Sequence, residues 1–126
     1  MKLKVTGVDH LNLEVIDLEK TLKFYNDLFG FEVLKEQPED NSKIIGNEKV
    51  KLCLYERGNF KGYENNGFYH FGLHVNNFKD IEKKCEELSI EIHYGGSIKW
   101  EKSSSYYITD PNGYDIELSE VFGGGL

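Results

Sequence analysis

The chain has few cysteines, no long apolar run and no excess of positive charge. Only Cys53 and Cys85 occur among its 126 residues, so a disulfide framework is not expected. No stretch approaches the roughly 18 apolar residues that a membrane helix needs. The formal net charge of −7 argues against nucleic acid and anionic membranes as partners. The first residues lack the apolar run of a signal peptide, so the sequence predicts a cytoplasmic location.

Motifs of several common enzyme classes are also missing. The chain contains no Gly-x-Ser-x-Gly elbow, no phosphate-binding loop and no dinucleotide-binding fingerprint. Hydrophobic residues make up 39% of the chain and charged residues 29%, as in an ordinary globular protein. A length of 126 residues suggests one compact unit, or two small modules that share one core.

The most informative feature that is present is an internal repeat centred on two histidines. His10 begins the segment His-Leu-Asn-Leu-Glu-Val, and His70 begins the matching segment His-Phe-Gly-Leu-His-Val. Apolar residues further along the two copies also fall into register. We therefore expect a single domain over residues 1–126, built from repeats 4–58 and 68–122 with a polar linker at 59–67.

Each copy predicts the order strand, helix and three strands. Apolar and polar residues alternate over residues 10–15, which is typical of a half-buried strand. Asp17 can cap the helix that follows, and Gly30 can end it. Asn77 is the equivalent cap in the second copy. The other strands are expected at residues 31–36, 42–45, 49–57, 68–75, 90–94, 104–109 and 114–121, with a turn at 110–113.

Alternation along the strands also predicts which polar side chains share a face. It places His10, His70 and Glu117 together on the face of the sheet that the helices do not cover. Two imidazoles and a carboxylate with open coordination positions form a known kind of divalent-metal site. His74 is a rival to His70, because it lies two residues further along the same face. The ligands alone do not distinguish zinc, nickel, manganese and iron.

Other residues on this face are candidates for substrate binding and catalysis. Asn12 can orient a substrate, and Trp100 lies in a loop that can fold over the face. Matching the last strand of each repeat places Cys53 at the position of Glu117. Cys53 is then a base, a fourth ligand or only a lining residue, and the sequence leaves these alternatives open.

Several segments carry one recognisable pattern over nearly the whole chain. They are Val8 to Leu13, Thr21 to Tyr25 with Leu28 to Phe31, His70 to Leu73, and Asp110 to Gly113 with Glu117 and Leu118. Together they resemble the vicinal oxygen chelate superfamily, which includes glyoxalase I, fosfomycin-resistance thiol transferases, extradiol dioxygenases and bleomycin-resistance proteins. The resemblance implies an α+β fold in which two βαβββ modules form a cup-shaped mixed sheet. It also implies a metal ion held by His10, His70 and Glu117.

The chain departs from individual members of that superfamily in informative ways. Glyoxalase I enzymes place a metal-binding Glu where this chain has Cys53. Extradiol dioxygenases carry a Tyr-x-x-Asp-Pro-x-Gly-x-x-x-Glu stretch that Tyr107 to Glu117 fits, but the His that precedes it is missing here. Fosfomycin enzymes also have a Tyr at the position of Tyr107, and they need a cationic residue near the C-terminus. No Lys or Arg follows Glu117. Bleomycin-resistance proteins lack the metal trio that this chain retains.

The resemblance predicts a divalent-metal-dependent enzyme of the glyoxalase type. Its substrate would be a small molecule that chelates the metal through neighbouring oxygens, and the reaction is that of a lyase, an isomerase or a ring-cleavage dioxygenase. Tyr107 is the predicted hydrogen-bond donor or acid. The alternative is a non-catalytic binding protein of the bleomycin-resistance type. A homodimer is expected, with the modules paired within one chain or swapped between two chains.

Overall fold

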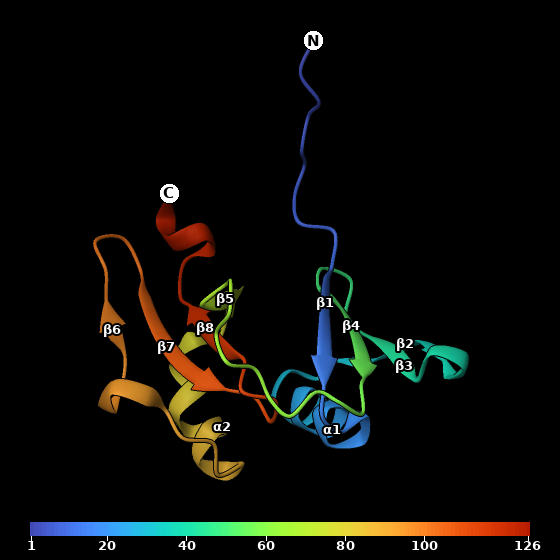
Figure 1. Cartoon of the computed structure of the whole chain (residues 1–126). Coiled ribbons are helices and arrows are strands. Elements are labelled where there is room, and N and C mark those ends of the chain that lie inside the picture. The colour runs from blue at the N-terminus through green and yellow to red at the C-terminus, as the bar shows by residue number, and fades with distance from the viewer. The chain divides into compact units, whose positions relative to one another are not determined.

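The computed structural model describes all 126 residues and contains the predicted βαβββ order twice (Figure 1). The chain divides into two compact units, here called unit 1 (Met1–Lys61) and unit 2 (Gly62–Leu126). Each unit has its own four-stranded mixed sheet. The predicted α+β class and the paired βαβββ order are therefore confirmed.

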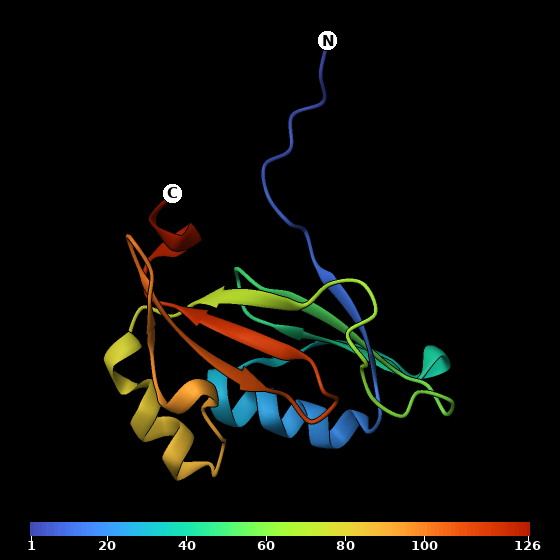
Figure 2. The ribbon, with the colours of Figure 1, turned by 60° about the vertical axis from the view of Figure 1, so that its left-hand side comes forward.

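Unit 1 is a mixed sheet with one long helix against it. Its elements are β1 (Leu11–Val15), α1 (Leu18–Phe29), β2 (Glu32–Gln37), β3 (Ser42–Gly46) and β4 (Lys51–Glu56), with a short 3₁₀ turn η1 (Pro38–Asp40). The strand order is β1-β4-β3-β2, with β1 parallel to β4 and the other pairs antiparallel. The N-terminal segment before β1 is exposed and runs away from the rest of this unit (Figures 1 and 2).

Helix α1 begins and ends where the sequence predicts. The Asp17 carboxylate accepts a hydrogen bond of 2.9 Å from the backbone N–H of Lys20, which caps the first turn. Gly30 ends the helix in the left-handed conformation, with φ of 72°, which glycine adopts without steric cost. The helix buries Tyr25 against a sheet face that includes Leu54, and both are fully buried. Each such side chain contributes about 1.5–3 kcal/mol of hydrophobic free energy.

Unit 2 repeats the sheet with shorter and less regular helices. Its elements are β5 (His70–His74), η2 (Phe78–Asp80), α2 (Ile81–Glu87), η3 (His93–Gly95), β6 (Ile98–Lys99), β7 (Ser104–Thr109), β8 (Asp115–Ser119) and η4 (Phe122–Gly125). The strand order is β5-β8-β7-β6, with β5 parallel to β8. Ile108, Ile116 and Cys85 are fully buried in its core.

The two sheets share the same strand register. In unit 1 Cys53 lies opposite Asn12, and in unit 2 Glu117 lies opposite Gly72. Asn12 and Gly72 are equivalent positions of the repeat, since each lies two residues after its histidine. Cys53 and Glu117 are therefore equivalent positions of the two units.

The largest difference from the sequence-based expectation lies between α2 and β7. The strand predicted at residues 90–94 does not form, and a 3₁₀ turn at His93–Gly95 takes its place. Tyr94, Gly95 and Gly96 all have positive φ values, which a regular strand cannot accommodate. The edge strand β6 (Ile98–Lys99) comes later and is only two residues long. Asn77 makes no capping hydrogen bond, because a 3₁₀ turn separates it from α2.

The predicted turn at 110–113 is present and joins β7 to β8. The Asp110 carboxylate accepts hydrogen bonds from the backbone N–H groups of Asn112 and Tyr114, at 2.8 and 3.0 Å. These bonds fix the start of β8 and with it the alternation that presents Glu117. None of the helices is long and apolar enough to span a membrane.

Candidate metal centre and adjoining pocket

Unit 2 brings together a histidine and a glutamate on neighbouring parallel strands. His70 begins β5, and Glu117 lies in the middle of β8. The His70 Nε2 atom lies 2.9 Å from the Glu117 Oε1 atom. Their side chains are 34% and 23% exposed, so the pair is open to a ligand from one side. The register explains the contact, because His70 pairs with Asp115, and Glu117 lies two residues further along β8 on the same face.

Two side chains of β7 surround the Glu117 carboxylate. The buried Ser105 hydroxyl donates a hydrogen bond of 2.5 Å to Glu117 Oε2, which leaves Oε1 for His70. Tyr107 lies directly opposite Glu117 in the β7–β8 ladder. Burial raises the pKa of Tyr107, and the negative charge and hydrogen bonding of Glu117 raise this pKa further. The phenol is therefore held in its protonated form, with a proton to donate at neutral pH.

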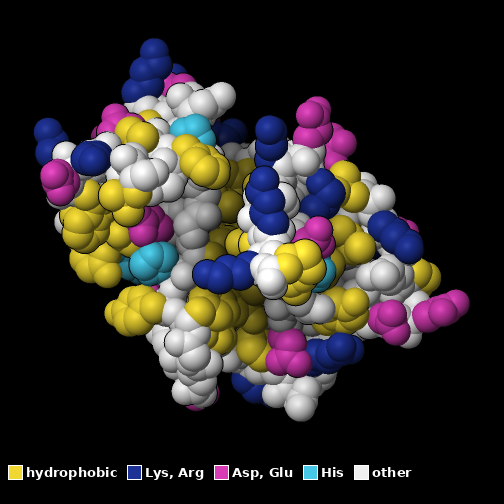
Figure 3. Space-filling view, turned by 90° about the horizontal axis from the view of Figure 1, so that it is seen from above, with side chains coloured by type: hydrophobic (Ala, Val, Ile, Leu, Met, Phe, Trp, Pro, Cys, Tyr) yellow, Lys and Arg dark blue, Asp and Glu magenta, His cyan; other side chains and the backbone are white.

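A small pocket opens beside this cluster on unit 2. Its volume is about 200 Å³ and its lining is mostly aromatic: Tyr69, His70, His93, Tyr94, Ile98, Trp100, Tyr107 and Asp115. Successive rings stand nearly perpendicular to each other, as between His70 and Tyr107, whose centroids are 5.6 Å apart at 77°. The surface view shows exposed histidines beside hydrophobic side chains (Figure 3). His70 thus belongs both to the His70–Glu117 pair and to the lining of an aromatic pocket.

A hydrogen-bonded chain at the edge of the pocket was not predicted from the sequence. Thr109 Oγ1 lies 2.7 Å from Asp115 Oδ1 and 2.9 Å from His93 Nε2. The carboxylate can only accept, so the Thr109 hydroxyl donates to it and accepts from His93. Alternation along β8 places Asp115 on this face from the sequence, and alternation with Tyr107 along β7 is a signal that could have placed Thr109 there. His93 had no such signal, because it lies in the turn that replaces the expected strand.

Three predicted site residues belong to unit 1. His10 precedes β1, its side chain is 48% exposed, and its Nδ1 atom lies 2.7 Å from Asp9 Oδ2. Asn12 is exposed on β1 and pairs with Cys53 on β4. Burial raises the pKa of the Cys53 thiol, and the charge of Asp9 adds to this effect. Cys53 is therefore a neutral thiol at physiological pH in the metal-free unit.

The other two predicted residues occupy different parts of unit 2. Trp100 lines the pocket, as expected for a residue that contacts a ligand. His74, at the far end of β5, is exposed, and its ring lies 5.9 Å from that of Phe122. His74 does not line the pocket. Unit 2 therefore assembles His70, Glu117, Tyr107 and Trp100 around one site and leaves His74 apart from it.

The donor atoms of the His70–Glu117 pair fit a divalent metal ion. Ligands bound to one ion at about 2.1 Å lie about 3 Å apart when their bonds are at right angles. The observed 2.9 Å between Nε2 and Oε1 matches this separation. It is also a hydrogen-bond distance when Nε2 carries the proton, so a metal ion would replace that proton. Within neither unit do three His, Cys, Asp or Glu side chains converge to hold an ion, so these two would need further ligands.

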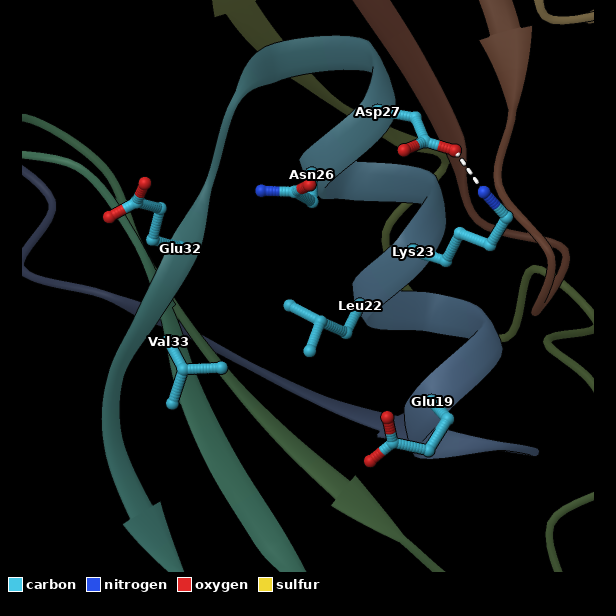
Figure 4. Close-up of a pocket in the computed structure, with 7 residues that line it drawn as sticks. All are labelled: Glu19, Leu22, Lys23, Asn26, Asp27, Glu32 and Val33. Carbon is cyan, nitrogen blue, oxygen red and sulfur yellow. Dashed lines mark hydrogen bonds and ion pairs between the residues drawn. The ribbon is translucent and has the colours of Figure 1, made fainter.

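A larger hollow on unit 1 lacks comparable chemistry. It has a volume of about 440 Å³ and lies between α1 and β2 (Figure 4). Its charged groups include Lys23 and Asp27, which pair with each other at 2.7 Å on the exposed surface of α1. No histidine, cysteine or aromatic side chain lines it. Size alone therefore does not identify the functional site, and the smaller pocket of unit 2 is the better candidate.

The paired βαβββ units and the His–Glu pair define the class of small α+β proteins that is built from two glyoxalase-type modules. A sequence profile of the Glyoxalase/Bleomycin resistance protein/Dioxygenase superfamily matches residues 7–118. The chain belongs to this superfamily.

Relatives with different activities match the chain to a similar extent. It is 26% identical to the metallothiol transferase FosB of Staphylococcus haemolyticus, over 90% of this chain and 83% of that protein. It is 27% identical to a probable lactoylglutathione lyase of Synechocystis, over 89% and 93%. It is 27% identical to the catechol-2,3-dioxygenase of Bacillus subtilis, over 90% of this chain but only 41% of that protein.

Solved structures agree on the fold. The fosfomycin resistance protein FosX of Listeria monocytogenes superimposes with a TM-score of 0.77 at 18% identity, covering 96% of each chain. A glyoxalase family protein of Enterococcus faecalis gives 0.76 at 21% identity, covering 91% of this chain and 98% of that one. These similarities establish the architecture and leave the reaction to the residues of the site.

Proposed function

We propose that the protein is a divalent-metal-dependent enzyme of the glyoxalase type. Its substrate is a small molecule that binds the metal through two neighbouring oxygens. The observation that carries this proposal is the 2.9 Å approach of His70 to Glu117 beside the protonated Tyr107 and an aromatic pocket. Superfamily membership supports it, because the relatives include a metallothiol transferase, a probable lyase and a dioxygenase.

In this proposal His10, His70 and Glu117 hold the metal ion. When bound, such an ion stabilises negative charge that develops on a substrate oxygen. The Ser105 hydroxyl orients the Glu117 carboxylate through Oε2. Tyr107 donates a hydrogen bond to the substrate oxygen or acts as an acid, since its proton is retained at neutral pH.

Two of the remaining predicted residues, Trp100 and Asn12, bind and orient the substrate. Trp100 contacts it from the pocket lining, and Asn12 orients it from β1. His74 has a peripheral role, because it is exposed and lies outside the pocket lining. Cys53 is a lining residue or a fourth ligand in preference to a base, because its thiol holds its proton in the metal-free unit.

Metal content tests the proposal directly. The purified protein is loaded with zinc, nickel, manganese or iron, passed through a desalting column and assayed by elemental analysis. We expect about one ion per complete site in the wild type, and loss of it in His70→Ala and Glu117→Gln. His74→Ala and Glu120→Gln are the matched controls, since each removes the same group type from an exposed position of unit 2. A metal-free wild type, or equal metal content in all four variants, would falsify the proposal.

The reaction type follows from a substrate panel. Turnover of methylglyoxal with one of several thiols would indicate a lyase or isomerase. Ring cleavage of one of a series of catechols would indicate a dioxygenase. The alternative function is a non-catalytic small-molecule-binding protein of the bleomycin-resistance type, which the superfamily also contains. That alternative is favoured if ligands bind the pocket with unchanged affinity in His10→Ala and Glu117→Ala and no metal is retained.

We further propose a cytoplasmic homodimer with no nucleic-acid or membrane partner. The formal charge of −7 supports the absence of polyanionic partners. A swapped dimer would combine His10 of one chain with His70 and Glu117 of the other. Sedimentation analysis of the metal-loaded protein tests this, since a metal-binding monomer contradicts the swapped arrangement.

A further inference from the structure

The aromatic rings of the unit 2 pocket are arranged as walls. The Tyr69 ring is at 89° to that of His70, with centroids 6.1 Å apart. The His70 ring is at 77° to that of Tyr107, and the Tyr107 ring at 83° to that of Tyr94, both at 5.6 Å. Successive rings are therefore turned by about a right angle in edge-to-face contacts, and all four line the same pocket. Trp100 adds a further ring to the lining.

The charge of the lining has one sign. Asp115 is its only carboxylate, and it contains no Lys or Arg. Asp115 accepts its hydrogen bond of 2.7 Å from a neutral hydroxyl, that of Thr109, so the bond leaves its negative charge uncompensated. Glu117, which adjoins the pocket, is occupied by His70 and Ser105 or by the metal ion of the proposed function. Asp115 is therefore the free charge that faces a ligand.

The backbone holds one of the walls in an unfavourable conformation. Tyr94 has φ of 61° and ψ of 16°, a left-handed conformation that a bulky residue rarely adopts. Its side chain is 71% exposed and gains little burial in return. Strain of this kind persists where the surrounding structure enforces it, and it is typical of ligand sites. Here it directs the Tyr94 ring against Tyr107 at the rim of the pocket.

We infer that the unit 2 pocket binds an alkylated ammonium group, with the aromatic walls around the cation and Asp115 as its counter-charge. Faces of tyrosine and tryptophan attract such cations, and desolvation strengthens the attraction. In the absence of the metal ion, an anionic group would meet Asp115 with no Lys or Arg in the lining to pair with it. The inference rests on the proposed function for the other end of the substrate, whose neighbouring oxygens would bind the metal beside His70.

A matched pair of probes tests this inference in the full-length protein. Choline carries a trimethylammonium group, and 3,3-dimethylbutan-1-ol is its neutral isostere. Trp100 is the only tryptophan of the chain and lines the pocket, so its fluorescence is a probe of binding there. We expect choline to bind at least about tenfold more tightly than the isostere. Equal affinities, or binding of phenol without binding of choline, would overturn the inference in favour of a neutral aromatic ligand.

Two variants with one control assign the effect to these residues. Asp115→Asn keeps the shape and the hydrogen-bond acceptor for Thr109, and it should weaken choline binding about five- to tenfold without changing that of the isostere. Tyr94→Asn removes the ring and suits the left-handed backbone, so it keeps the test valid if Asp115→Asn does not fold. Glu120→Gln removes an exposed charge outside the pocket and should change nothing. Equal weakening by Glu120→Gln would overturn the role of Asp115.

The titrations are run in chelator and again after metal loading, which separates this inference from the proposed function. Choline selectivity without retained metal supports the ammonium pocket and contradicts the metalloenzyme. Retained metal without choline selectivity supports the metal site and overturns the ammonium pocket.

Discussion

The two units repeat one scaffold, including its leading histidine, but differ at the positions equivalent to Glu117 and Tyr107. Where unit 2 has Glu117 with Tyr107 opposite it, unit 1 has Cys53 with Ile44 opposite it. Ser105 of unit 2 donates a hydrogen bond to that glutamate. Its equivalent in unit 1, Ser42, donates a hydrogen bond to Gln37, the last residue of β2. The shared register therefore fixes the positions of the side chains, and substitution at a few of them concentrates the polar cluster in unit 2.

The largest expected effect is a loss of stability on substitution in the apolar sheet faces, which the two units share. Leu54 and Leu118 are equivalent core residues with 0% and 1% exposure. Leu54→Ala and Leu118→Ala should each lower the free energy of unfolding by about 2–5 kcal/mol, because each leaves a cavity in a packed sheet face. Urea denaturation measures this. A cost below about 0.5 kcal/mol for only one of them would show that the cores are not equivalent.

The hydrogen bond to Glu117 distinguishes unit 2 from unit 1. Ser105→Ala should weaken metal binding about 10- to 100-fold, because Glu117 Oε2 loses the hydroxyl that orients it. Ser42→Ala is the matched control, since Ser42 is also buried and also donates to a side chain. Both variants should lose a similar stability of about 1 kcal/mol. Metal titration in competition with a chelator is the measurement. An equal loss of affinity in both would mean that Ser105 acts through stability alone.

The features that the sequence predicts are those with local signals, and the features that it does not predict depend on the surrounding structure. Strand alternation and capping residues are local signals, and they placed α1 and the shared face of His70 and Glu117 correctly. The pairing of Cys53 with the position of Glu117 followed from the repeat. The turn at His93–Gly95 could not be predicted from the sequence, because Tyr94 adopts a left-handed backbone conformation that its residue type disfavours. Such a conformation is imposed by the surrounding structure, so no local pattern announces it.

The polar chain from His93 to Asp115 was missed for the same reason. Its two strand members alternate regularly with Tyr107 and Glu117, but His93 reaches them only because the turn replaces a strand. The aromatic pocket likewise depends on the turn, since Tyr94 and His93 both line it. The sequence therefore predicted that His70 and Glu117 share a face, but it did not predict the pocket beside them.

The helices offer a smaller and sharper comparison. Asp17 caps α1 with a hydrogen bond of 2.9 Å, whereas Asn77 makes no capping bond to α2. Asp17→Ala should cost about 1 kcal/mol of unfolding free energy, and Asn77→Ala only a few tenths. Thermal or urea denaturation of the two variants measures this. A larger cost for Asn77→Ala would indicate that the hydrogen bond of its side chain to Asp80, at 3.4 Å, stabilises unit 2 more than its exposure suggests.

The smallest effect is expected for the two cysteine thiols. Their reactivity distinguishes the units without any change in stability. Burial raises the pKa of both Cys53 in β4 and Cys85 in α2, and Asp9 contributes at Cys53. The thiolate is the reactive form, so at a given pH each holds less of it than a free cysteine does. Alkylation of Cys53 by iodoacetamide should therefore be slow at pH 7 and accelerate as the pH rises toward the raised pKa of the thiol.

Exposure then distinguishes the two cysteines in the same experiment. Cys85 is fully buried, whereas Cys53 is partly exposed. In metal-free native protein, mass spectrometry should show one label, at Cys53, with a second label at Cys85 only after unfolding in urea. Labelling of Cys53 at pH 7 as fast as a free cysteine would mean that its thiolate is stabilised. The base role at this position would then regain support, and the chemical asymmetry between Cys53 and Glu117 would be smaller than their side chains suggest.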